Sequence, residues 1–126
     1  MSPNKLLARH ELPNGLILEV WDRSHPVAAD RHRVVLEARI AIPVNGSALP
    51  PELASQAETV TAALGPELIF TRREERNFIP EAEVAVILDD MKTRLLTLAP
   101  AYLGHPEFAP RFIRQKYQEY LKGSAS

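Results

Sequence analysis

The chain has 126 residues, of which 45% are hydrophobic and 25% charged, an ordinary composition for one globular domain. Its 15 Lys and Arg residues nearly balance 16 Asp and Glu residues, and the formal net charge of −1 argues against bulk attraction to nucleic acid or membrane. The absence of cysteine excludes disulfides, thiolate catalysis and cysteine-based metal sites. The start of the sequence lacks the ~7–15 apolar residues of a secretory signal. We therefore expect one cytoplasmic domain over residues 1–126, with a frayed tail at 123–126 and no membrane association.

The first two expected strands, residues 6–12 and 16–22, form a hairpin around the turn sequence Pro-Asn-Gly. A two-residue loop would mix apolar and charged side chains on both faces. A three-residue loop with Gly15 in the left-handed conformation pairs His10 with Leu18 and Leu7 with Trp21, and it segregates the faces better. We therefore predict the three-residue loop, with His10 partly buried on the apolar face.

The clearest strand is expected at residues 33–44, where apolar residues alternate with polar ones. One face of this strand is therefore core and the other meets solvent, as in an antiparallel sheet. The preceding residues 23–32 include Pro26 and Asp30 and are expected to form a long connection. Residues 67–77 predict a fourth strand, which carries charge on both faces and so belongs at a sheet edge or in a projecting arm.

Three helices are expected, at residues 50–64, 80–99 and 110–123, each opening with proline and showing helical apolar spacing. Residues 84–88 could instead form a buried strand, because short apolar runs are ambiguous by periodicity. The chain order is then β-β-β-α-β-α-α. This order predicts an α+β fold with about four antiparallel strands and about three helices mainly on one face.

A group of histidines and aspartates brackets the expected connection at 23–32: Asp22, His25, Asp30 and His32. Histidine nitrogen and carboxylate oxygen are the metal ligands that remain when cysteine is absent, and they suit zinc, iron or manganese. The spacing matches no known metal motif, and surface loops are rich in polar residues in any case. We predict no cofactor, and a metal-binding protein or metal-dependent enzyme using these four residues is the alternative function.

The other motifs with chemical meaning are missing. No serine lies in a Gly-x-Ser-x-Gly turn, and the five glycines form no nucleotide-binding loop. The last helix places Arg111, Arg114 and Lys122 on one face, but neighbouring glutamates dilute this charge. The sequence therefore argues against nucleic-acid binding.

A protein partner is the third possibility. Trp21 and Ile17 fall on the strand face that also carries charged residues, and a tryptophan ringed by polar groups is typical of an interface anchor. Alternatively, a helix covers this face and Trp21 belongs to the core. The charged fourth strand offers edge pairing between two copies. We expect a small non-catalytic interaction or scaffold module, with a protein partner or self-association as a homodimer.

Overall fold

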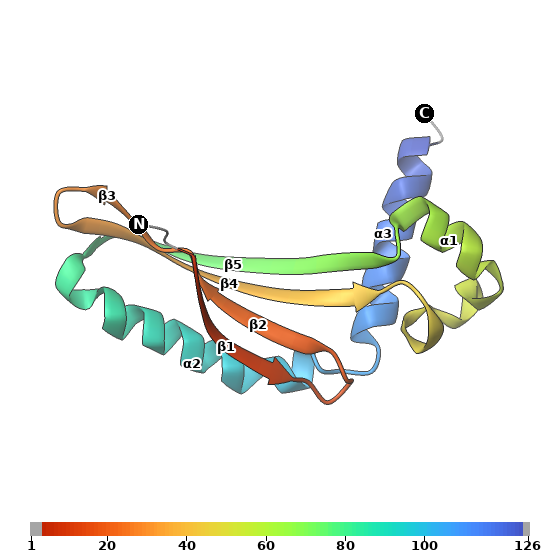
Figure 1. The fold of residues 1–126 in the computed structure, drawn as a ribbon, viewed down its shortest axis with the longest axis horizontal. Helices are drawn as coiled ribbons and strands as arrows, with labels where there is room; N and C mark the ends of the chain where they lie inside the picture. The colour runs from red at the N-terminus through yellow and green to blue at the C-terminus, as the bar shows by residue number, and fades with distance from the viewer. Residues whose placement is uncertain (1–3, 125–126) are drawn as a thin grey trace.

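The structure is a computed structural model that describes residues 4–124, and it contains a five-stranded antiparallel sheet and three α-helices (Figure 1). The strands are β1 (Lys5–Glu11), β2 (Ile17–Asp22), β3 (His25–Ala28), β4 (Arg31–Pro43) and β5 (Glu67–Pro80). The helices are α1 (Ala57–Leu64), α2 (Val84–Tyr102) and α3 (Phe108–Ser124), with single 3-10 turns or short 3-10 segments at Gly46–Ala48, Pro51–Gln56 and Glu81–Glu83. The predicted α+β class with an antiparallel sheet is confirmed.

The first hairpin has the predicted three-residue loop. Gly15 adopts φ 87°, and the amide of Leu12 donates a hydrogen bond to the carbonyl of Leu16 at 2.7 Å. His10 lies opposite Leu18, as expected. The register then shifts, so that Leu6 rather than Leu7 lies opposite Trp21. The prediction that His10 is partly buried is wrong, because β1 is an edge strand and leaves this side chain exposed.

The connection expected at residues 23–32 contains a strand, β3, and a tight turn. β2 and β3 both pair with β4, Asp22 opposite Leu36 and His25 opposite Arg33, so they form one strand broken at Arg23 and Ser24. At the break, the Ser24 hydroxyl accepts a hydrogen bond from the amide of Val35 at 3.0 Å, replacing a ladder bond. The sequence predicted a connection here, with Pro26 and Asp30 in it, but an edge strand tolerates proline.

β4 is the central strand of the sheet, between β2 and β3 on one side and β5 on the other. It confirms the strand expected at 33–44 and begins two residues earlier, at Arg31. Its residues 34–38 are all buried, although only alternate ones face the helices. β5 extends to Pro80, beyond the predicted end at residue 77, and most of its side chains are exposed.

The helices differ from the prediction at their ends. The helix expected at 50–64 begins as a 3-10 segment and becomes α-helical only at Ala57. Residues 84–88 are helical, and α2 continues past Pro100 because Pro100 lies in its last turn, where one lost backbone bond is tolerated. α3 begins at Phe108, before the expected 110. It also runs to Ser124, so the tail predicted to fray at 123 is helical as far as 124, while residues 125–126 lie outside the described residues.

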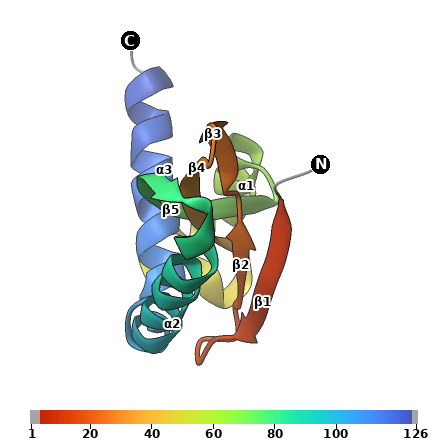
Figure 2. The ribbon, with the colours of Figure 1, turned by 90° about the vertical axis from the view of Figure 1, so that its left-hand side faces the viewer.

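The core lies between one face of the sheet and the helices, with α2 running along β4 (Figures 1 and 2). The most deeply buried core side chains come from β2, β4, α1, α2 and α3: Leu18, Val20, Val34, Ile40, Ile42, Val60, Met91 and Ile113. The hairpin loop packs on the turn between α2 and α3, where the Asn14 amide donates to the carbonyl of Leu103 at 2.9 Å. Gly104 permits this approach, because a Cβ there would overlap Pro13.

Candidate interaction surface on the open sheet face

The sheet face opposite α2 has no described helix lying along it, and we call it the open face (Figure 2). It is built from the side chains of β1, β2, β4 and β5 that alternate with the core residues. By register these side chains include Arg9, Ile17, Glu19, Trp21, Glu37, Arg39, Ala41, Ile69, Thr71 and Arg73. Their charges and aromatic ring therefore meet solvent or one another, and the apolar core lies on the other side of the sheet.

Trp21 is half-buried on the open face and is held by two neighbours on its own strand and at the strand break. Its Nε1 donates a hydrogen bond to Oε1 of Glu19 at 3.2 Å, and the Arg23 guanidinium lies 4.7 Å from the ring centroid. A cation above an aromatic face is an attractive arrangement that orders both side chains. The hollow in which Trp21 lies is lined by residues of strands and of the hairpin loop, so within residues 4–124 the ring is partly exposed there and is not core under a helix.

Glu37 lies next to Trp21 on the central strand and is only 6% exposed. Arg23 donates to Oε2 with its Nη2 at 3.0 Å, and Arg73 donates to Oε1 with its Nε at 2.8 Å. Burial alone raises the pKa of Glu37, but the hydrogen bonds and positive charges of Arg73 and Arg23 outweigh it and bring the pKa below its usual value. Glu37 is therefore ionised at neutral pH, and each of its two carboxylate oxygens accepts a hydrogen bond from an arginine.

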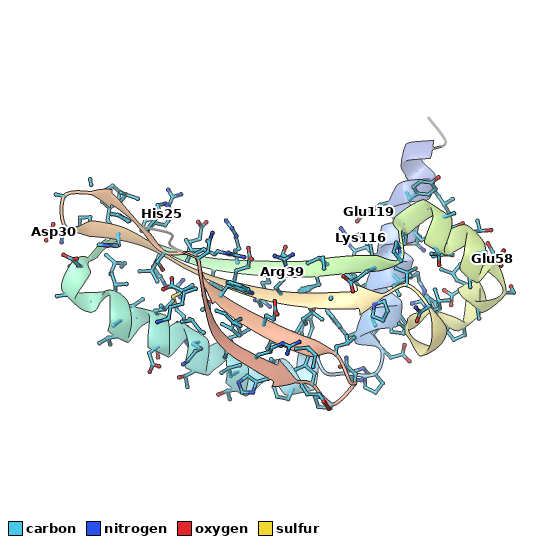
Figure 3. All side chains as sticks on the ribbon, viewed as in Figure 1. His25, Asp30, Arg39, Glu58, Lys116 and Glu119 are labelled. Atoms are coloured by element: carbon cyan, nitrogen blue, oxygen red, sulfur yellow. The ribbon has the colours of Figure 1, made fainter. Side chains whose placement is uncertain are left out.

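A hollow of about 560 Å³ opens on this face between the hairpin and β5. Besides Gly15 and Leu16 at the hairpin loop, it is lined by Arg9, Ile17, Glu19, Trp21, Arg39, Ala41, Pro43 and Ile69. Arg39 is placed on β4 in the middle of the sheet (Figure 3). Its cross-strand neighbours are Glu19 and Thr71, but Glu19 pairs instead with Arg9, at 3.8 Å, and with Trp21.

Arg39 is the unmatched charge of the hollow. Within residues 4–124 its side chain makes no hydrogen bond or ion pair, although it is partly buried. The hollow holds two arginines and one glutamate, whereas Glu11 and Glu75 lie further out on the same face, opposite Ile17 and Val35. The floor of the hollow therefore carries a local positive charge beside apolar surface.

The four residues predicted as metal ligands are placed along β2, β3, the turn after β3 and the start of β4. Asp22 accepts a hydrogen bond from the amide of Ser24 at 2.8 Å, and Nδ1 of His25 lies 3.2 Å from the carbonyl of Arg23. Asp30 is exposed at the turn, where it pairs with Arg31, and Figure 3 shows it away from His25.

His32, the fourth predicted ligand, is partly buried on β4, and its Nδ1 is buried without a hydrogen-bond partner. In the part of the chain that the structure describes, no three histidine, aspartate or glutamate side chains are grouped closely enough to hold a metal ion. The structure therefore does not gather the four predicted ligands, and the metal site stays a prediction.

By contrast, the structure brings Trp21 and Ile17, the predicted interface residues, to one hollow. Sequence reasoning missed Arg39 and Glu37, because their strand positions were understood only as solvated charges. The signal that could have found them is the register of β2 against β4, which sets Glu37 beside Trp21 and Arg39 beside Glu19.

Comparisons with protein families, with curated proteins and with solved structures give no match to this chain. No helix within residues 4–124 is long and apolar enough to cross a membrane.

Proposed function

We propose that this protein is a non-catalytic interaction module whose open face binds an acidic segment of a partner protein. The observation that carries the proposal is Arg39, a partly buried guanidinium without a partner within residues 4–124, on the floor of a hollow that also exposes Trp21. A guanidinium offers five donors in a planar fork that matches a carboxylate.

The surroundings of Arg39 favour a bound carboxylate over bulk water. Ile17, Ala41 and Ile69 line the same hollow as Arg39, and a charge-assisted hydrogen bond strengthens where apolar atoms displace solvent. The nearest internal acid, Glu19, is already held by Arg9 and Trp21. An incoming acidic side chain therefore meets Arg39 without an internal competitor.

Trp21 supplies the second half of the recognition surface. Tryptophan and arginine are the residues that most often dominate binding energy at interfaces. The ring is held in advance by Arg23 and Glu19, so little conformational entropy is lost when a partner covers it. The segment that fits this hollow combines an acidic residue for Arg39 with an apolar residue for Trp21 and Ile69.

An NMR titration of ¹⁵N-labelled protein tests the proposal with a defined probe. The probe is a soluble peptide of repeated Glu-Leu-Gly units, and a peptide of Gln-Leu-Gly repeats is its uncharged control. We expect shift changes confined to amides of β2, β4 and β5 around Trp21 and Arg39, much weaker with the control and reduced by salt. Changes that are absent, scattered over the helices or equal for both peptides would contradict the proposal.

A further inference from the structure

An exposed row of side chains four residues apart winds along α2, and its C-terminal part borders β5. The row consists of Val86, Asp90, Arg94, Leu98 and Tyr102. Val86, Leu98 and Tyr102 are 72%, 69% and 65% exposed, and they are three of the four most exposed large apolar side chains within residues 4–124. Large apolar side chains grouped on one exposed helix row mark an interaction surface.

The order of chemical types along this row is self-complementary. From Val86 to Leu98 the row is apolar, acidic, basic and apolar, and an antiparallel copy presents the same order in reverse. Asp90 and Arg94 form an ion pair at 3.2 Å with more than half of each side chain exposed, so both can also reach a second molecule. When two copies of the row lie antiparallel, each apolar residue faces an apolar residue and each acidic residue faces a basic one.

The charges around the two ends of α2 repeat this pattern. Acidic residues flank its first half, namely Glu81, Glu83, Asp89 and Asp90. Its second half borders a hollow of about 440 Å³ that contains Arg72, Glu74, Arg94, Leu95, Leu98 and Tyr102. Within residues 4–124 Arg72 makes no hydrogen bond or ion pair through its side chain. The acidic end of one α2 therefore complements the basic, apolar end of another.

We infer that two copies of this chain associate through antiparallel packing of α2 on α2, around a two-fold axis midway between Asp90 and Arg94. In this register Val86 contacts Leu98 of the second copy, and Asp90 pairs with Arg94 of the second copy. Rows of side chains spaced by four residues are the ridges that interdigitate in the commonest class of helix packing. Each contact occurs twice because the interface is isologous.

The size of the surface sets the expected strength of the dimer. One helix per subunit, with the neighbouring hollow, is a small interface, and small interfaces give weak, reversible association, with a dissociation constant of roughly micromolar order. The open face lies on the other side of the sheet, so this inference does not rest on the proposed binding of acidic segments.

Sedimentation equilibrium across a wide concentration range, with charge-reversal variants, tests the inference. Asp90→Arg or Arg94→Asp alone replaces two attractive pairs with two repulsive ones, and each should raise the dimer dissociation constant roughly tenfold or more. Combining both changes in one chain restores the match and should restore the dimer, as should mixing the two single variants. The control is Glu58→Lys, an equal charge reversal on α1 at the far end of the molecule (Figure 3), which should leave dimerisation unchanged.

Cross-linking then tests the register, and the cysteine-free chain makes each introduced cysteine unique. Val86→Cys mixed with Leu98→Cys should give a disulfide-linked heterodimer under mild oxidation. Val86→Cys alone should link poorly, because the two copies of residue 86 lie roughly 18 Å apart along the helix axes. A monomeric wild-type protein at all concentrations would overturn the inference. So would a double charge swap that stays monomeric while folded, or equal linking of residue 86 to itself.

Discussion

The two faces of the sheet are built from the same strands but differ in almost every property. The face toward the helices is apolar and closed, with Leu18, Ile40 and Ile42 at most 1% exposed. The open face buries a carboxylate between two arginines and displays Trp21 and Arg39. Apolar burial is the main source of folding stability, whereas a buried ion pair adds little net stability. The covered face therefore holds the fold together, and the open face is the surface that we propose for recognition.

The largest effect that distinguishes the faces is expected from a cavity in the covered face. Ile40→Ala removes a side chain that is 1% exposed in the centre of the core, and it should lower the free energy of unfolding by about 3–4 kcal/mol. Chemical denaturation of the purified variant measures this change. A loss below about 1 kcal/mol would show that the covered face is not tightly packed, and the contrast between the faces would fail.

The next largest effect is expected from Glu37→Gln, on the open face. The change removes the charge that both Arg23 and Arg73 contact, and Arg23 is left largely buried without an anionic partner. We expect a loss of about 2 kcal/mol at pH 7. Arg9→Gln, which breaks an exposed pair on the same face, is the matched control, and it should cost less than about 0.5 kcal/mol. We call Glu37, Arg23 and Arg73 the Glu37 cluster. Equal losses of unfolding free energy in the two variants would mean that this cluster stabilises the fold no more than an exposed ion pair does.

The Glu37 cluster also predicts a pH dependence. Because its pKa is lowered in the folded state, the carboxylate stabilises the protein fully above its usual pKa of 4.5, and this stabilisation is lost as pH falls through the lowered folded value. The difference in melting temperature between the wild type and Glu37→Gln should therefore be large at pH 7 and shrink below about pH 4. A melting-temperature difference that stays constant over this pH range would contradict the claim that Glu37 is ionised in the folded protein.

The smallest effects on stability, but the largest on binding, are expected at the hollow. Arg39→Gln breaks no hydrogen bond or ion pair within residues 4–124 and should change the free energy of unfolding by less than about 0.5 kcal/mol. The same change should weaken binding of the Glu-Leu-Gly peptide roughly tenfold. Thermal melting and calorimetric titration of one preparation measure both quantities. If Arg39→Gln lost stability but still bound the peptide normally, Arg39 would support the fold and would not serve binding, contrary to the role given to the open face.

The alternation of apolar and polar residues, together with the residue types at the turns, was enough to predict most of the fold. The alternating apolar residues of β4 and the Gly15 turn gave a strand and a register that the structure confirms near the hairpin. β3 could not be predicted, because it contains Pro26 and depends on pairing with β4 rather than on its own pattern. Local propensity cannot show such a strand, since its stability comes from a neighbour distant in sequence.

The candidate site was only half predictable for a related reason. Trp21 and Ile17 stand out by residue type, and their shared face follows from alternation along β2. Arg39 and Glu37 are ordinary charged positions until the pairing of β2, β4 and β5 shows which charges neutralise each other. The unmatched arginine is a property of three strands together, so no single segment of the sequence reveals it.

Fluorescence of Trp21 is the sharpest test of acidic-segment binding by the open face, because Trp21 is the only tryptophan in the chain and lies in the hollow. The wild type and Arg39→Gln are titrated with the Glu-Leu-Gly peptide at low and moderate salt. We expect a saturable change in Trp21 emission for the wild type, weakened by salt and by Arg39→Gln. No saturable change, or the same titration curve for both proteins, would contradict the assignment of the open face as an acidic-segment binding surface.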